Sequence, residues 1–259
     1  MITISISSQK GGVGKTTTSI NLSHAYARHG CRTLLIDADP QGSVGLSLTR
    51  QSRLLEGFYD LIEDRERDLS SVIIPTKLET LNLVPAGQSS EYETSGTNVD
   101  LSQARLQTIL HEAEQAGYDI CLIDTAAGLF GATATIISVS DAVLIPQQSE
   151  PLGIRSVPKM LEALVKMKRS NPSLQVLGVL LTMVQKHLEE SRDAAISLRN
   201  LLPPGMVLKT MIPREDLFIK ASARGLPVGV MENGGPVLEI FEHLRREIAG
   251  KLTGPAGVY

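Results

Sequence analysis

The segment at positions 9–17, Gln-Lys-Gly-Gly-Val-Gly-Lys-Thr-Thr, constrains the fold of this chain more than any other feature. It ends like a phosphate-binding loop of the pattern G-x-x-x-x-G-K-[ST], in which backbone amides surround phosphate oxygens and a lysine reaches the terminal phosphates. Gly14, Lys15 and Thr16 supply that ending. Gln9 stands where the first glycine should be, and a second lysine, Lys10, follows it. The loop predicts phosphate binding with an additional cation.

The residues around the loop support this interpretation. Ile2, Ile4 and Ile6 alternate with polar residues, which predicts a short strand that runs into the glycines. Apolar residues from Ile20 onward recur at helical spacing until Gly30. The order strand, glycine-rich turn, helix directs the unpaired amides of a helix N-terminus at an anion.

Apolar strand-like runs alternate with helical segments along the whole chain. The runs lie at 33–36, 81–84, 120–123, 142–145, 176–181 and 207–212, and helices are expected at about 101–116, 153–169, 189–201 and 236–252. Several runs are continuously apolar, which is typical of parallel strands covered on both faces. We therefore expect an α/β fold: a doubly wound, mostly parallel twisted sheet flanked by helices, with ligands at the carboxyl ends of the strands. Residues 1–259 are expected to form one domain, and the polar segment 87–100 an exposed loop.

Composition narrows the possible locations and partners. No apolar run approaches the ~18 residues of a membrane span, and the N-terminus lacks a secretory signal pattern, so a cytoplasmic protein is expected. The two cysteines, Cys31 and Cys121, are expected to be reduced core residues. Residues 1–150 carry a net charge of −8 and residues 151–259 a net charge of +5. This asymmetry permits a basic binding face on the second half, although helix solvation would explain the individual lysines equally well.

Two apolar runs end in carboxylates that could serve a nucleotide's magnesium ion. Asp37 and Asp39 follow the run at 33–36, and Asp124 follows the run at 120–123. An apolar strand that ends in aspartate commonly places the acid beside the metal or its bound water. The alternative for Asp37 is a structural role in the turn.

These motifs together resemble the deviant Walker-type ATPases of the ParA/MinD family, and ParA-type partition ATPases most closely. The resemblance rests on Lys-Gly-Gly-Val-Gly-Lys-Thr-Thr at 10–17 and Asp-Ala-Asp-Pro-Gln-Gly at 37–42. It extends with less specific matches to 145–150, 181–183 and 211–214. It implies a P-loop NTPase fold with ATP and Mg²⁺ as cofactors.

The resemblance also implies a role for individual residues. Lys15 would contact the β- and γ-phosphates, Thr17 the α-phosphate, and Lys10 the nucleotide of the partner subunit in an ATP-dependent homodimer. Asp39 would orient the attacking water. The metal would be bound by Thr16 and supported by Asp37 and Asp124, the last through water. The implied nucleotide-binding residues are Lys10, Gly11, Gly12, Val13, Gly14, Lys15, Thr16, Thr17, Met183 and Pro213.

Two segments depart from the family pattern. Residues 125–128 read Thr-Ala-Ala-Gly where many ParA proteins carry Cys-Pro-Pro, so the hydrolysis rate is expected to differ. Residues 228–236 contain no basic residue, although ParA proteins often carry a basic stretch there for nonspecific DNA contact. The chain starts at its first strand, so the N-terminal helix-turn-helix of larger ParA proteins is not expected. DNA contact would then depend on other basic residues, with Lys186, Arg192, Lys209, Lys220, Arg224, Arg245 and Arg246 as candidates.

Three functions remain as hypotheses at this point. The favoured one is an ATPase with weak intrinsic activity that dimerises on ATP, binds DNA nonspecifically on the nucleoid, and is stimulated by a ParB-like or other activating partner. The alternative is a membrane-cycling ATPase of the MinD or flagellar-number type, which needs a basic amphipathic C-terminal helix. The helix at 236–252 carries mixed charge and fits core packing better. A reductase-type ATPase with a bridging iron–sulfur cluster is disfavoured because two cysteines in core strands cannot supply such a cluster.

Overall fold

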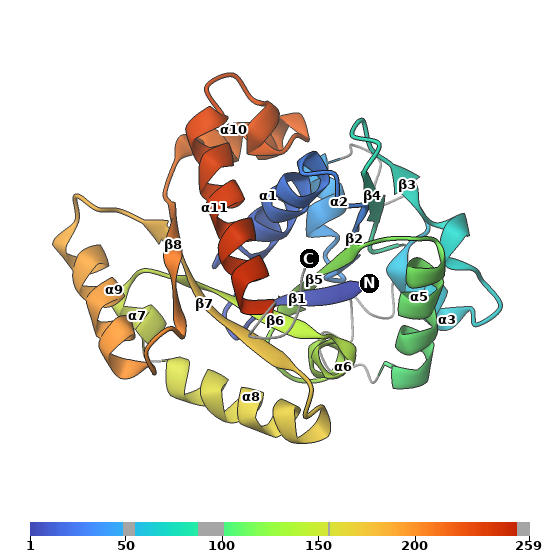
Figure 1. The fold of residues 1–259 in the computed structure, drawn as a ribbon, viewed down its shortest axis with the longest axis horizontal. Coiled ribbons are helices and arrows are strands. Elements are labelled where there is room, and N and C mark those ends of the chain that lie inside the picture. Colours follow the sequence, from blue (N-terminus) through green and yellow to red (C-terminus); the bar gives the residue numbers. More distant parts are fainter. Residues whose placement is uncertain (49–54, 88–100, 155, 253–259) are drawn as a thin grey trace.

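Eight strands form one central sheet in the computed structural model, which describes residues 1–48, 55–87, 101–154 and 156–252 (Figure 1). The order across the sheet is β3-β4-β2-β5-β1-β6-β7-β8. Every strand pair is parallel except β3 with β4 at the edge. The strands are β1 (Ile2–Ser8), β2 (Thr33–Ala38), β3 (Ile74–Pro75), β4 (Leu81–Val84), β5 (Ile120–Ala127), β6 (Ala142–Gln148), β7 (Gln175–Val184) and β8 (Val207–Pro213). The expectation of a mostly parallel α/β sheet is confirmed.

Helices cover both faces of this sheet (Figure 1). On one face α1, α2, α10 and α11 lie over the strands, and on the other α3, α5, α6 and α8 do so. The helices are α1 (Lys15–Arg28), α2 (Ser43–Leu48), α3 (Phe58–Glu63), α5 (Gln103–Gln115), α6 (Ala132–Val139), α7 (Pro151–Ile154), α8 (Val157–Ser170), α9 (Glu189–Leu201), α10 (Asp216–Arg224) and α11 (Gly235–Leu252), with 3₁₀ turns η2 (Leu69–Ser71) and η4 (Val228–Val230). Burial on both faces explains why the strands read as continuous apolar runs.

The central strand β1 leads directly into the glycine-rich loop and then into α1. Its neighbours are β5 on one side and β6 on the other, so the chain crosses to opposite sides of β1. Such a point, where the strand order reverses, opens a crevice at the carboxyl ends of a doubly wound sheet. The register of β2 against β5 pairs Asp37 with Asp124, which places both carboxylates at this crevice.

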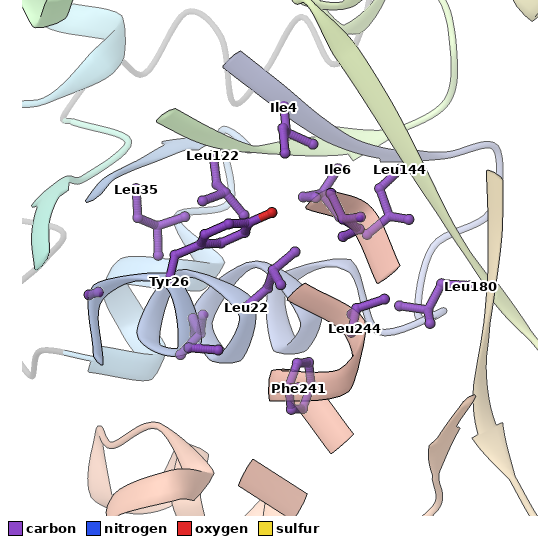
Figure 2. Close-up of a cluster of buried hydrophobic side chains, with 14 of the residues drawn as sticks. Ile4, Ile6, Leu22, Tyr26, Leu35, Leu122, Leu144, Leu180, Phe241 and Leu244 are labelled. Carbon is purple, nitrogen blue, oxygen red and sulfur yellow. The ribbon is translucent and has the colours of Figure 1, made fainter. Parts of the chain in front are cut away.

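The core on the α1 face is a layer between the sheet and α11. Leu22 and Tyr26 of α1 lie between β-strand side chains such as Leu122 and the α11 residues Phe241 and Leu244 (Figure 2). Phe241, Leu244 and Ile248 are buried. The apolar face of α11 is thus used in the core, as the mixed charges of the helix suggested. Among the described segments, every helix is too short or too polar to cross a lipid bilayer.

The sequence predicted most element positions and missed several short ones. The helix at 189–201 and the strand at 81–84 match α9 and β4. The single helix expected at 153–169 is instead two helices, α7 and α8, and Ser156 lies in a turn directly before α8. β5 continues to Ala127, so Asp124 lies within the strand. The loop expected at 87–100 lies, except for Gly87, outside the described residues. Cys31 and Cys121 are both unbridged, with Cys121 buried in β5.

Candidate nucleotide site

The loop between β1 and α1 has the geometry of an anion cradle. Gly12 and Gly14 have φ angles of 74° and 86°, a left-handed conformation that side chains rarely adopt. Helix α1 begins at Lys15, so its first unpaired backbone amides face the loop. The Lys15 side chain is only 7% exposed. A buried lysine above free amides creates a concentrated positive potential for phosphate oxygens.

Asp124 of β5 meets the first turn of α1 through two hydroxyls. Thr16 Oγ1 donates to Asp124 Oδ2 at 2.7 Å, and Ser19 Oγ donates to Asp124 Oδ1 at 2.8 Å. Burial raises the pKa of Asp124 to about 6, although these two hydrogen bonds and the Lys15 charge oppose the shift. A fully buried carboxylate held only by side-chain hydroxyls can exchange those partners for a hydrated cation.

Asp37 is equally buried but is held by the backbone. Its carboxylate accepts from the amides of Asp39 at 3.2 Å, Val44 at 2.9 Å and Gly45 at 3.2 Å. Burial, followed by the Asp124 charge, raises the pKa of Asp37 well above its usual value. These bonds fix the turn between β2 and α2, which gives weight to the structural alternative for Asp37. Its support of a metal remains a prediction.

Asp39 differs from Asp37 and Asp124 because it lines a cavity beside the loop. That cavity has a volume of about 400 Å³ and is also lined by Lys15, Thr16 and Ser43. We call it the phosphate-side cavity. Asp39 is half-buried, and its Oδ1 accepts the Gln41 amide at 3.0 Å. A carboxylate in this position can accept a hydrogen bond from water beside a bound phosphate.

A second cavity of about 580 Å³ adjoins the first on the side of β7 and β8. We call it the base-side cavity. Met183 and Phe218 line both cavities, and Pro213 and Ile219 line the second. Met183 has a φ of 52°, an uncommon left-handed conformation for a residue with a side chain. The end of β7 is tied to the loop because Thr182 Oγ1 donates to the Val13 carbonyl at 2.8 Å. The apolar part of this lining suits a planar base, and contact of Met183 and Pro213 with a nucleotide stays a prediction.

Lys10 differs from the two glycines that follow it in its burial. Gly11 and Gly12 are exposed and line the first cavity, whereas Lys10 is half-buried and is not among its described lining residues. Of the two lysines of the loop, Lys15 lines the cavity and Lys10 is not among its described lining residues.

The unusual segment at 125–128 continues β5 past the loop. Thr125 is buried, with its Oγ1 2.9 Å from Ser7 Oγ and donating to the Ile6 carbonyl at 3.1 Å. Ala127 lines the phosphate-side cavity. Thr125 thus bonds β5 to β1, and only the small Ala127 side chain faces the cavity. The sequence did not single out Phe130, which is 62% exposed just beyond this segment.

The donor set suits a magnesium ion that keeps most of its water. Among the described residues, no group of three or more His, Cys, Asp and Glu side chains is close enough to enclose a metal. The oxygens beside Lys15 come from the Thr16 hydroxyl and the buried Asp124 carboxylate. Mg²⁺ is bound in this way in nucleotide sites, by few protein oxygens together with phosphates and waters. The residues present fit the ion.

The basic residues proposed for DNA contact separate into exposed and buried ones. Lys186 and Lys209 line a groove of about 630 Å³ between β7, β8 and α11, and Lys220 and Arg224 lie on α10. Arg192 and Arg246 are also exposed. The prediction of DNA contact is wrong for Arg245. This residue is 8% exposed, and its Nε donates to Glu242 Oε2 at 3.2 Å. Helix α11 turns Arg245 toward α1, so it does not offer a surface charge to DNA.

Three residues of the site were missed by the sequence reasoning. Ser19 shares Asp124 with Thr16, Asn21 lines the phosphate-side cavity, and Phe218 lines both cavities. Ser19 could have been found from its spacing, because it lies one helical turn after Thr16. Nothing in the sequence near Phe218 or Asn21 indicates their partners, which come from distant segments.

Comparisons with known proteins agree with this geometry. Residues 1–176 match a family model described as an AAA domain. The chain is 32% identical to the sporulation initiation inhibitor protein Soj of Bacillus subtilis, over 95% of this chain and 97% of Soj. It is also 32% identical to the chromosome partitioning protein ParA of Caulobacter vibrioides, over 96% and 94%. The solved structure of cobyrinic acid a,c-diamide synthase from Mycobacterium smegmatis with bound ATP analog and magnesium has the same fold, with a TM-score of 0.77, 23% identity and coverage of 98% and 96%.

Proposed function

Because the chain belongs to the ParA/MinD family of P-loop ATPases, we propose that it is a partitioning or positioning ATPase that dimerises on ATP and binds DNA nonspecifically. Its cofactors are ATP and Mg²⁺, its intrinsic hydrolysis is slow, and a ParB-like or other partner protein stimulates it. It acts in the cytoplasm, on the nucleoid in the ATP state.

One observation carries the ATPase proposal: the contact between Thr16 and Asp124 beneath the buried Lys15. It joins a phosphate cradle to a carboxylate positioned for a metal-bound water. Lys15 stabilises negative charge on the terminal phosphates, and Asp39, which lines the same cavity, orients the attacking water. The protein's contribution is positioning and charge stabilisation.

The two lysines of the loop provide the test of dimerisation. Lys15 lines the cavity, so Lys15→Ala should abolish productive ATP binding. Lys10 is not among its described lining residues, so Lys10→Ala should retain ATP binding but lose the ATP-dependent dimer and with it hydrolysis. Light scattering on size-exclusion fractions with and without ATP measures the dimer. Equal dimerisation of wild type and Lys10→Ala would remove the assignment of Lys10 to the partner's nucleotide.

Substitution of Asp39 should separate ATP-dependent dimerisation from ATP hydrolysis. Because Asp39 faces the cavity without contacting Lys15 or Thr16 in any described hydrogen bond, Asp39→Ala should still bind ATP and dimerise. Phosphate release should nevertheless slow by about a hundredfold, as expected when a water-orienting group is removed. Asp39→Ala that hydrolyses ATP at the wild-type rate would show that another group orients the water.

The groove between β7, β8 and α11 is the best-supported DNA surface. Lys186, Lys209 and Arg214 give its lining three cationic side chains, and Glu215 is the acidic residue of the lining. The basic and titratable lining residues are Lys186, His187, Lys209, Arg214 and His243. Contact with DNA phosphates here should be independent of base sequence and should weaken steeply with salt.

Retention of the ATP-bound protein on unrelated duplex DNA, measured from about 50 to 200 mM salt, tests this surface. The double variant Lys186→Ala, Lys209→Ala should reduce retention on DNA. Arg245→Ala should not reduce it through a lost phosphate contact, because the Arg245 side chain is buried. ATP-dependent sedimentation with anionic liposomes, in place of DNA retention, would favour the membrane-cycling alternative. The partner protein can be identified by affinity capture with the Asp39→Ala dimer, using the ATP-free protein as control.

A further inference from the structure

The segment at 228–236, which lacks the basic residues expected for DNA contact, packs against the phosphate-loop helix instead. Turn η4 at its start contacts α1, α10 and α11. Figure 1 shows α10 and α11 on the same side of the sheet as α1. Val228 is buried and is one of the residues that line the phosphate-side cavity. The segment is therefore part of the wall of the nucleotide site.

Asn21 joins this wall to the loop helix. Its Nδ2 donates to the Thr17 carbonyl at 2.8 Å, within α1. Its Oδ1 accepts the Val228 backbone amide at 2.8 Å, across 207 positions of sequence. Asn21 is 6% exposed, and its bond to Val228 is buried and would be costly to lose, whereas its bond to Thr17 is partly buried. One side chain thus connects Thr17, a predicted phosphate ligand, to the turn that follows α10.

Glycines allow η4 to come this close. A side chain at Gly229 would meet His24 Cε1 of α1 at 2.9 Å, and one at Gly234 would meet the Val228 carbonyl oxygen at 2.0 Å. The second of these contacts is with backbone, which cannot move without moving Val228. Close packing on α1 thus explains Gly229, and the close approach of the segment to its own backbone explains Gly234.

The position of η4 decides where α10 lies. Phe218 and Ser222 of α10 line both cavities, and Leu226, between α10 and η4, lines the first. Phe218 also packs edge-on against Phe241 of α11, with ring centroids 6.4 Å apart. Phe241 supports this wall through its contact with Phe218, and the hydrogen bond between Asn21 and Val228 supports it at its C-terminal end.

We propose that Asn21 is a positioning residue for nucleotide binding: it holds the α10–η4 segment against α1, so that the phosphate and base cavities form one site for a purine nucleoside triphosphate. This inference rests on the proposed ATP binding. It assigns to Asn21 the support of the α10–η4 wall, and Asn21 makes no described hydrogen bond to Lys15, Thr16 or Asp124.

The test compares two probes, ATP and inorganic tripolyphosphate, by calorimetric titration of the full chain. Asn21→Ala should weaken ATP about tenfold, the value expected for loss of one buried hydrogen bond that orders a binding wall, and leave tripolyphosphate affinity unchanged. Gly234→Ala should give the same pattern, because it displaces Val228 without touching Asn21. Thermal melts confirm that each variant is folded.

Asn171→Ala is the matched control. Asn171 also makes two side-chain hydrogen bonds, donating to the Ser140 carbonyl at 3.0 Å and accepting from Ser173 Oγ at 2.6 Å, at the opposite end of the molecule. It should leave both affinities unchanged. Unchanged ATP affinity in Asn21→Ala and Gly234→Ala, or an equal loss for ATP and tripolyphosphate, would overturn the inference. A wild-type protein that binds neither probe would instead overturn the proposed function.

Discussion

Asp37 and Asp124 are neighbours across two strands of the sheet, yet the structure uses them differently. Both are fully buried, both lie at the crevice, and burial raises the pKa of each. The three described hydrogen bonds of Asp37 come from backbone amides, whereas the two of Asp124 come from the hydroxyls of Thr16 and Ser19.

The difference separates a structural carboxylate from one available for chemistry. Backbone amides can only donate, and they cannot move without unfolding the turn that leads to α2. Hydroxyls can rotate, donate or accept, and release the carboxylate to a new partner. Two aspartates with the same burial and the same motif appearance can therefore have separate roles, and the same substitution at each should distinguish them.

Among these variants Asp37→Asn should have the largest effect, and the quantity that it changes is the free energy of unfolding. The new amide group would face at least one backbone amide that now donates to the carboxylate, and the buried donor would lose its acceptor. A cost of about 3 kcal/mol in the free energy of unfolding is expected. Urea denaturation of the nucleotide-free protein measures it. A loss below about 1 kcal/mol would show that the turn does not depend on this carboxylate.

Asp124→Asn should change activity more than stability. The Thr16 and Ser19 hydroxyls can reorient toward an amide, and removal of a buried charge offsets the loss of charge-assisted bonds. Magnesium-dependent hydrolysis should fall by about a hundredfold, because the carboxylate no longer supports the metal-bound water. A steady-state phosphate assay beside the same urea series measures both quantities. If Asp124→Asn instead destabilised the protein as much as Asp37→Asn, the two carboxylates would have the same role.

The pH dependence of stability should sharpen the comparison further. The folded-state pKa of Asp124, about 6, lies above its usual value of 3.8, so its contribution to stability is present at low pH and is lost as pH rises through about 6. Without Mg²⁺, wild type should therefore lose stability relative to Asp124→Asn between about pH 4 and pH 6. Urea titrations of both proteins in EDTA across this range give the difference. A constant difference would contradict the raised pKa.

Ser19→Ala should have the smallest effect. It removes one of the two hydroxyls on Asp124 and leaves the Thr16 bond, so hydrolysis should slow about threefold to fivefold, equivalent to a bond of about 1 kcal/mol. Ser23→Ala is the control, because the buried Ser23 hydroxyl donates to the Ser19 carbonyl at 2.6 Å and makes no described contact with a carboxylate. Equal rates for the two variants would indicate that Ser19 does not support Asp124.

Much of the site could be predicted because its signals are local. The spacing of Gly14, Lys15 and Thr16 after an alternating strand indicates the cradle, and an apolar run followed directly by Asp124 indicates the metal side. The role of Asp37 could not be chosen in advance, because it depends on how the amides of Val44 and Gly45 turn back toward the strand. Arg245 was misplaced for the same reason, since its helix face is decided by packing on α1.

The sequence by itself determined the α/β class, the phosphate loop, the separation of Lys10 from Lys15 along the chain, and most strand and helix positions. These follow from periodicity and short motifs, which depend on residues a few positions apart. Only the tertiary structure decided the different partners of Asp37 and Asp124, the burial of Arg245, and the bond from Asn21 to Val228. Each of these depends on which distant segments the packed sheet brings together, and no local pattern records that.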